Sequence, residues 1–216
     1  MATGTSAQGE APSKRALQRE ETRQRIIESA AECFAERGFE GSSTREIAAR
    51  AGTNQGLITY HFKSKELLWK AAADHVFGGV RRELDEGRAR IEGINDPRER
   101  ARASIRGFVR YSALHPEISR LMIEEGKTED ERMVWLVDRY VRTMYETFCE
   151  YGVEFREPEG MVLGDELLPH AFYAMVGAAS VIFMVVPECE VMTGLNPTAS
   201  EAIERHADYV ARLFVP

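Results

Sequence analysis

Residues Ser43–Phe62 read STREIAARAGTNQGLITYHF, and this stretch decides the fold that we predict for the chain. It divides at Gly52, because a glycine accepts the left-handed conformation that commonly follows the last turn of a helix. Ser43 and Glu46 have the spacing of a capping box, in which the hydroxyl accepts a hydrogen bond from the first turn and the glutamate bonds back to the N–H of residue 43. The pair Ile47-Ala48 then forms the buried face of this first helix.

A second helix follows at Asn54–His61, with Thr53 or Asn54 as its cap. Leu57 and Ile58 form its apolar face. Its other side leaves polar and aromatic groups available for contact, namely Thr53, Gln55, Thr59, Tyr60 and His61. Two short helices joined by a tight turn, the second with such a face, predict a helix-turn-helix whose second helix enters the major groove of DNA.

The charge distribution agrees with this prediction, although the formal net charge is −7, from 28 Lys and Arg against 35 Asp and Glu. Residues Lys14–Lys70 hold 11 basic and 8 acidic residues, whereas the remainder of the chain is acidic. A basic end can bind phosphates while an acidic body discourages indiscriminate binding along DNA. Because the local excess of positive charge is modest, specific contacts have to supply much of the affinity for DNA.

Composition predicts a soluble, cytoplasmic protein without a membrane partner. The chain has 216 residues, of which 44% are hydrophobic, enough for an ordinary core. Met1–Ala16 lacks the apolar centre of a signal peptide and is expected to be a flexible arm. The longest apolar run, Ala171–Val186, is interrupted at Ser180 and is shorter than the roughly 18 to 20 residues of a membrane span.

Apolar residues recur at helical spacing along most of the chain, and this predicts an all-α fold. We expect a flexible arm at residues 1–17, a three-helix DNA-binding domain at 18–64, and a larger helical ligand-binding and dimerisation domain at 65–216. The first helix is expected at 18–37, and Ser64 caps a long helix that ends before Gly93. Pro116 and Pro187 each end a helix. Further helices are expected at about 97–115, 117–125, 129–151, 166–186 and 198–214.

The region from about residue 20 to residue 70 resembles the tetracycline-repressor-like (TetR) family of one-component regulators. The matching marks are Phe34, Gly38-Phe39, Thr44, Ile47-Ala48, Ala51-Gly52, Gly56, Tyr60-His61-Phe62 and Lys65-Glu66-Leu67-Leu68. The chain departs from the common pattern at Thr53, where an aliphatic residue is usual, and at Thr59, where an aromatic residue is common. These departures bear on the operator sequence and not on the fold. The resemblance does not extend to the effector, because the later parts of such proteins diverge.

The resemblance implies two kinds of DNA contact. Thr44, Tyr60 and Lys65 correspond to phosphate contacts, which fix the register of a protein on DNA. Gln55 and Thr59 correspond to base readers, since an amide bonds adenine and a threonine methyl touches thymine. Arg45 fits either role, and each of these residues has the alternative of being simply solvated. The expected DNA-binding set is Thr44, Arg45, Thr53, Asn54, Gln55, Thr59, Tyr60, His61 and Lys65.

The last two helices are the candidates for a homodimer interface. Between Phe172 and Val186 apolar residues point in every direction, so that one neighbouring helix cannot cover them all. Two such helices from each subunit would form a four-helix interface, with a buried core helix of a monomer as the alternative. The expected interface residues are Phe172, Val176, Gly177, Ala179, Ser180, Phe183, Ile203, His206, Val210 and Leu213.

An effector pocket is expected beside the helix at 129–151. Its apolar stripe, rich in methionine and aromatic residues, is typical of a site for a small apolar or aromatic ligand, although plain core packing is the alternative for each residue. Trp135 points away from this stripe and the sequence assigns it no role. The expected lining is Phe108, Met122, Val137, Val141, Met144, Tyr145, Phe148, Phe172 and Met175.

Other classes of protein find less support in the sequence. The histidines are scattered, the glycines form no phosphate loop, and Cys33, Cys149 and Cys189 are read as buried reduced thiols, so we expect no enzyme activity, cofactor or metal. A helical adaptor that binds only other proteins would account for the apolar helices, but it would not account for the residue pattern Gly56–Lys65. The resulting hypothesis is a homodimeric repressor that binds double-stranded operator DNA and is released by a small-molecule effector. Effector identity, target genes and activation in place of repression are left open.

Overall fold

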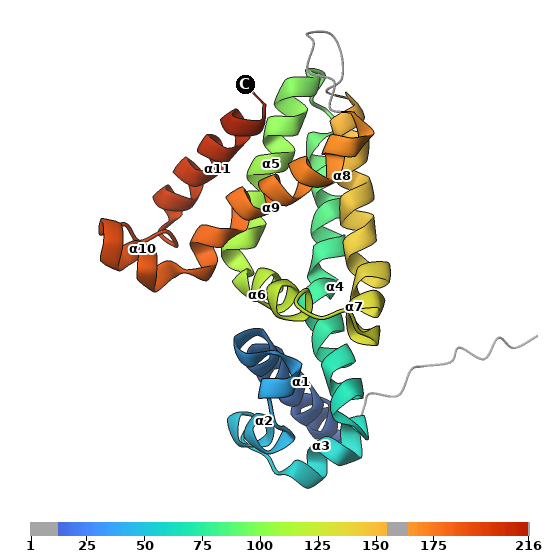
Figure 1. Cartoon of the computed structure of the whole chain (residues 1–216). Helices are drawn as coiled ribbons and strands as arrows, with labels where there is room; N and C mark the ends of the chain where they lie inside the picture. Colours follow the sequence, from blue (N-terminus) through green and yellow to red (C-terminus); the bar gives the residue numbers. More distant parts are fainter. Residues whose placement is uncertain (1–12, 155–163, 216) are drawn as a thin grey trace, which may run out of the picture.

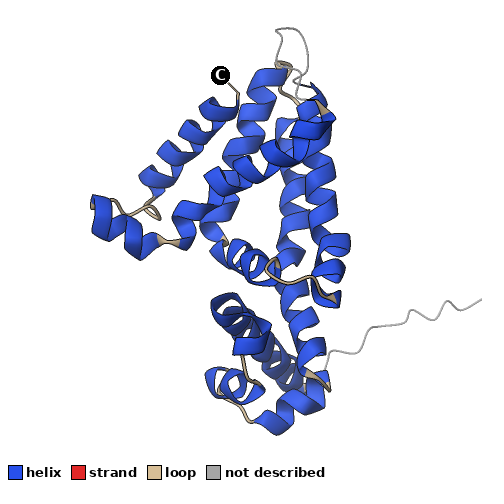
Figure 2. Ribbon diagram, in the orientation of Figure 1, coloured by secondary structure: helices blue, strands red, loops and turns tan. Residues whose placement is uncertain are grey.

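The computed structural model describes residues 13–154 and 164–215, and within them every regular element is helical, as Figure 2 shows. This confirms the all-α prediction. A small group formed by α1, α2 and α3 lies at one end of the molecule, and α4 runs from this group into the larger body (Figure 1). The helices are α1 Lys14–Gly41, α2 Thr44–Arg50, α3 Gln55–Phe62, α4 Lys65–Ile91, α5 Pro97–Leu114, α6 Pro116–Glu125, α7 Glu131–Leu136, α8 Arg142–Glu154, α9 Leu168–Met184, α10 Val186–Thr193 and α11 Ser200–Phe214.

Side-chain caps define the starts of α2, α3 and α4 as expected. Ser43, Asn54 and Ser64 each accept a hydrogen bond at 3.1 Å from the backbone N–H three residues further on. The second half of the predicted capping box is wrong, because the carboxylate of Glu46 bonds to the guanidinium of Arg37 on α1 instead of returning to residue 43. That ion pair links α1 to α2.

Several helix boundaries differ from the sequence prediction. The helix α1 begins at Lys14, inside the expected arm, because the Ser13 hydroxyl caps it at 3.2 Å. Pro187 does not end the chain's apolar helical region; it lies in the first turn of α10, where its fixed φ is compatible with a helix. The helix expected at 129–151 is interrupted by a π-helical turn at Val137–Val141. Pro116 likewise begins α6 directly after α5 ends.

Buried apolar residues form two clusters. The first extends without a break from α1, α2 and α3 into α4, α6 and α7, with Phe34, Trp69 and Phe77 at its centre. The second joins α5, α9 and α11 around Val109, Phe183 and other fully buried residues. Because the first cluster crosses the expected domain boundary at residue 64, the small helical group is packed onto the body and not merely tethered to it.

A buried charge lies within the first cluster, at the point where the two parts meet. Glu125 of α6 is only 2% exposed, and its carboxylate accepts hydrogen bonds from Trp69 Nε1 at 3.1 Å and from Arg132 Nε at 3.2 Å. Burial raises the pKa of Glu125, and Arg132 and the two hydrogen bonds oppose that rise. The Arg132 guanidinium also lies 3.9 Å from the centroid of the Phe39 ring on α1. This set of contacts connects α1, α4, α6 and α7.

Trp135, which the sequence left without a role, belongs to this region. Its ring packs edge-on against Trp69 at 5.6 Å and against Tyr140 at 6.0 Å, and Tyr140 stacks on Phe77 at 5.0 Å. The four rings form an aromatic row that fixes α7 and the π-helical turn on α4. Its position explains why Trp135 falls outside the predicted pocket stripe.

Asp165–Met184 is long and apolar enough to cross a membrane by length and composition alone, with a mean hydropathy of 1.7. This differs from the expectation based on the run 171–186, because the helix begins earlier than that run. In this structure α9 packs against α5, α6, α8 and α11, while its residues Tyr173 and Val181 remain exposed. The apolar composition therefore serves packing within the body and leaves part of the apolar surface exposed.

Replacement of Glu125 tests the buried contact. We expect Glu125→Ala to lower the free energy of unfolding by about 2 to 4 kcal/mol, because it leaves the Trp69 N–H and part of the Arg132 guanidinium buried without an acceptor. Urea unfolding followed by tryptophan fluorescence measures the change. The matched control is Glu124→Ala, whose carboxylate is partly exposed and pairs with Lys127, with an expected change of about 0.5 kcal/mol or less. Equal losses of stability in the two variants would contradict the conclusion that the buried contacts of Glu125 stabilise the fold.

Candidate DNA-binding and effector sites

The predicted DNA-contact residues lie on α2, on α3, in the turn between them and, for Lys65, at the start of α4. Gln55 and Thr59 are exposed, and Tyr60 is 62% exposed. Gln55 Nε2 donates a hydrogen bond to Thr44 Oγ1 at 2.9 Å, which joins the first turn of α3 to the start of α2. Asn54 uses its side-chain oxygen as the helix cap and so serves the backbone of α3. The structure therefore brings a base-reading candidate and a phosphate candidate side by side.

The end of α3 carries an aromatic pair next to arginines of α1. Tyr60 and His61 pack edge-on with ring centroids 5.1 Å apart, and the Arg19 guanidinium lies 5.5 Å from the Tyr60 centroid. Burial, and then the charges of Arg19 and Arg23, lower the pKa of His61. The imidazole is therefore held in a positive environment that disfavours its own protonation.

Lys65, at the start of α4, is partly turned toward the protein. Its Nζ lies 4.2 Å from the centroid of the Phe39 ring, the same ring that Arg132 contacts. One aromatic side chain of α1 therefore meets cations from both α4 and α7. A phosphate contact by Lys65 would compete with this cation–π contact, a relation that the sequence pattern did not show.

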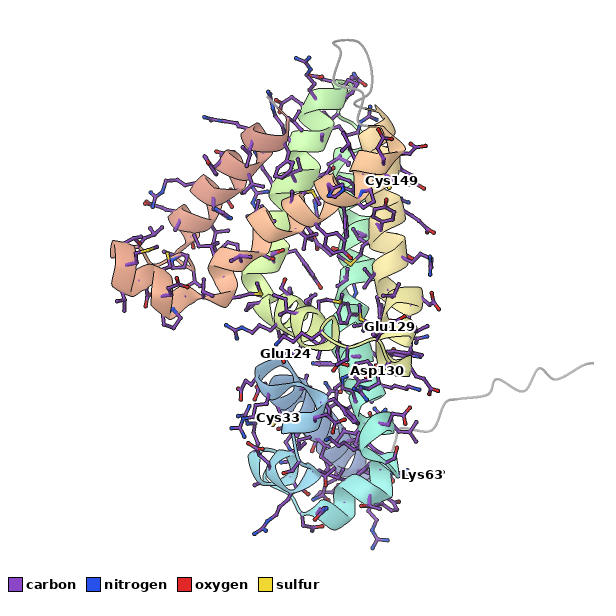
Figure 3. All side chains as sticks on the ribbon, in the orientation of Figure 1. Cys33, Lys63, Glu124, Glu129, Asp130 and Cys149 are labelled. Atoms are coloured by element: carbon purple, nitrogen blue, oxygen red, sulfur yellow. The ribbon has the colours of Figure 1, made fainter. Side chains whose placement is uncertain are left out.

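Cysteine and metal chemistry find no support among the described residues. Cys33, Cys149 and Cys189 are free thiols, and Figure 3 shows Cys33 and Cys149 in different parts of the molecule. Burial raises the pKa of the Cys33 thiol, which disfavours a reactive thiolate. Within residues 13–154 and 164–215, His, Cys, Asp and Glu form no group of three or more that could hold a metal ion.

The body contains a cavity of about 1260 Å³ between α4, α5, α6, α8 and α9, which is partly open to solvent. Its volume exceeds the roughly 300 to 1,000 Å³ of common ligand pockets. Apolar and aromatic side chains dominate its wall. Seven predicted residues line it: Phe108, Met122, Val137, Val141, Met144, Tyr145 and Phe172.

The other two predicted residues lie outside the wall. Phe148 packs edge-on against Phe172 at 5.5 Å, and Met175 packs on the second buried cluster. Sequence reasoning missed Tyr111 of α5 and His115, the residue that follows this helix, which line the cavity with their ring centroids 4.4 Å apart. Their spacing of four residues on a helix was the available signal.

The polar part of the cavity wall is largely neutralised. Its five arginines each form an ion pair: Arg88 with Glu150, Arg90 with Glu83, Arg106 with Asp208, Arg110 with Glu204 and Arg142 with Asp138. The Arg110 pair is bidentate, at 2.7 and 2.6 Å, and the hydrogen bond from Arg110 lowers the pKa of Glu204. An anionic ligand would have to displace a carboxylate to use any of these cations.

The predicted interface residues divide between the core and the cavity. Phe172, Ala179, Ser180, Phe183 and Val210 are buried within the chain. His206 donates from Nε2 to the Ala178 carbonyl at 2.9 Å, and burial lowers its pKa. Val176 and Gly177 line the cavity, and of this set only Leu213 is largely exposed. The large apolar residues of α9 and α11 that are exposed are Tyr173 and Val181, which also line the cavity, and Tyr209 and Leu213.

An all-helical body that carries a terminal helix-turn-helix defines the class of this protein. Residues 26–72, which contain the helix-turn-helix, match the model of "Bacterial regulatory proteins, tetR family". The match covers α2 and α3 entirely, together with the buried part of α1 and the start of α4.

Relatives of known name agree with this assignment. The chain is 29% identical over 112 residues to the HTH-type transcriptional repressor NicS of Pseudomonas putida, an alignment that covers 52% of this chain and 51% of NicS. It is 26% identical over 139 residues to the probable regulator YttP of Bacillus subtilis, an alignment that covers 63% of this chain and 67% of YttP. The repressor Rv3405c of Mycobacterium tuberculosis is 45% identical over 58 residues, or 27% of this chain and 31% of Rv3405c. The first of these relatives is thus matched over only about half of its length.

Solved structures show the same fold over nearly the whole chain. AibR, crystallised with isovaleryl coenzyme A and operator DNA, has a TM-score of 0.68 at 20% identity, covering 90% of this chain and 98% of AibR. A TetR-family regulator from Bordetella parapertussis has a TM-score of 0.69 at 19% identity, and the superposition covers 89% of this chain and 93% of that regulator. At these identities the likeness establishes the fold of the body and not its ligand.

Gly177 provides a test of the cavity. A Cβ atom at this position would have nothing within 4 Å, so we expect Gly177→Leu to fill cavity space without lowering stability. Binding of the neutral fluorescent probe N-phenyl-1-naphthylamine should then fall at least fivefold, while the melting temperature stays the same or rises, because leucine favours a helix more than glycine does. Gly78→Leu is the matched control, since this helical glycine also faces open space and lies outside the cavity wall. Unchanged probe binding in Gly177→Leu would contradict the cavity assignment.

Proposed function

We propose that the chain is a ligand-responsive transcriptional repressor, which binds double-stranded operator DNA as a cytoplasmic homodimer and is released by a small apolar or aromatic effector. One observation carries the proposal: an exposed recognition helix and a large apolar cavity lie at opposite ends of α4 and share a continuous buried cluster. The names of the relatives support a regulator of transcription in place of an enzyme.

Contacts around Glu125 suggest how an effector would act on DNA binding. Met122 and Gly126 of the α6 region and Met133 of α7 line the cavity, and they flank Glu125 and Arg132 in sequence. A ligand that pushes on these residues would move the side chain that contacts Phe39 of α1. In this proposal the ligand binds more tightly to an arrangement in which the two recognition helices of a dimer no longer match adjacent major grooves. The factor by which the ligand lowers the affinity for DNA then equals the factor by which DNA lowers the affinity for the ligand.

The wall of the cavity supports an uncharged effector. Its arginines are paired with carboxylates. A ligand that carries phosphate groups, such as a coenzyme A thioester, would therefore find no unpaired arginine among the described wall residues. In AibR the ligand is isovaleryl coenzyme A, so this chain is expected to differ from that protein in effector class. The predicted lining residues, Phe148 and Met175 excepted, form the proposed binding surface.

The homodimer is proposed through the exposed apolar residues of α9 and α11. Tyr209 and Leu213 of α11 expose apolar surface, as do Tyr173 and Val181 of α9, which also line the cavity, and a second copy would bury this surface in a four-helix arrangement. Of the residues that the sequence suggested for this role, Phe172, Ala179, Ser180, Phe183 and Val210 are already buried within the chain.

Selection of DNA by the purified full chain tests the proposal. We expect the protein to enrich duplexes from a random library with two related half-sites centred about 10 base pairs apart, or a multiple of that spacing. Neutral apolar compounds that raise the melting temperature of the protein should weaken binding to the selected duplex in fluorescence anisotropy. Failure to enrich any duplex would refute the regulator, and a monomer in sedimentation at micromolar concentration would refute the dimer.

Single substitutions separate the proposed DNA contacts. Tyr60→Phe removes an exposed hydroxyl and should weaken binding to every duplex alike, because a phosphate contact carries no sequence information. Gln55→Ala should instead relax the preference at one base pair, at a cost of about 1 to 3 kcal/mol there. Binding to the selected duplex and to variants with each base pair changed measures both effects. Unaltered affinity and preference in both proteins would exclude these residues from the DNA contact.

A further inference from the structure

The first three turns of α1 contain no buried residue and extend away from the core. Every residue from Ser13 to Glu21 is exposed, Leu17 included, and the first buried side chain of the helix is Ile26. A helix gains little stability from such an extension alone, since most helical stability in proteins comes from packing of one face. Figure 1 shows this beginning of α1 alongside α3.

Arginines at every fourth position form a stripe on this extension, which we define as Arg15, Arg19 and Arg23. The Arg19 guanidinium lies 5.5 Å from the Tyr60 centroid, and the Arg23 guanidinium lies 5.5 Å from the Phe62 centroid, so the stripe faces the recognition helix. Because residues four apart share one side of a helix, Arg15 continues the stripe one turn beyond Tyr60.

Two members of the stripe carry an unneutralised charge. Arg23 pairs with Glu20 at 3.4 Å, whereas Arg15 and Arg19 form no ion pair with a carboxylate in the described part of the chain. Glu20 lies beside Arg23 and neutralises it, whereas Glu21 projects from another side of the helix at its 100° per residue. Burial, and after it the charges of Arg19 and Arg23, lower the pKa of His61, which agrees with a positive potential beside the end of α3.

We propose that Arg15 and Arg19 form a second DNA contact, which binds the phosphate backbone next to the base pairs that α3 reads. The inference rests on the proposed function, because it requires that α3 enters a major groove. Exposed guanidinium groups on a rigid helix bind phosphate oxygens without sequence preference. The first helix of the chain thus adds affinity, and the recognition helix supplies specificity.

The salt dependence of binding tests this contact in the full chain. We expect the double substitution Arg15→Ala with Arg19→Ala to lower the slope of log K against log salt by about 1.8 per bound subunit, since each phosphate contact contributes about 0.9. The duplexes are the one enriched by the wild-type protein and an unrelated duplex of equal length, and both should lose affinity by a similar factor. Arg15→Lys with Arg19→Lys retains the charges and should keep most of the slope.

Controls separate this contact from general charge and from the proposed function. Arg25→Ala removes an exposed arginine from the other side of the same helix and should leave the slope within about 0.3 of wild type. Circular dichroism and melting temperature check that each variant is folded. An unchanged slope in the double variant, or an equal loss in Arg25→Ala, would overturn the second contact while operator binding by the wild type stands. A wild-type protein that binds neither duplex would overturn both proposals.

Discussion

A buried carboxylate that must have partners is the constraint on which this structure depends. Glu125 cannot remain charged at 2% exposure without its bonds to Trp69 and Arg132, and satisfying it fixes α6 on α4 and α7 on α6. Arg132 then reaches Phe39, which positions the end of α1. One charge therefore sets how the small DNA-binding group sits on the body that holds the cavity.

The sequence predicted those features that depend on neighbours within a few residues. Ser43, Asn54 and Ser64 cap their helices as expected, because capping is a local interaction. The pairing of Arg110 with Glu204 joins residues 94 positions apart, and no periodicity reveals such a contact. The apolar stripe at 129–151 predicted four of the residues that line the cavity, Val137, Val141, Met144 and Tyr145, but not the larger part of its wall. The faces of α9 could not be assigned, since a helix that is apolar on all sides gives no preference for one neighbour.

The helix α9 illustrates how one element serves two surfaces. Phe172, Val176 and Gly177 line the cavity, and so do Tyr173 and Val181, which are also exposed and belong to the surface proposed for the second subunit. A ligand in the cavity would therefore act directly on that surface. In the proposed dimer, effector binding and the geometry of the interface are therefore coupled through the helix α9 itself.

The π-helical turn at Val137–Val141 has a consequence for how this chain can vary. Trp135 and Tyr140 both contact the α4 side, although residues five apart would diverge by about 140° on a regular α-helix. Deleting a single residue from the turn would restore α-helical bonding and rotate α8 by about 100°, which carries Met144 and Tyr145 off the cavity wall. The length of this segment is thus more tightly constrained than its composition, so that insertions and deletions are excluded where substitutions are tolerated.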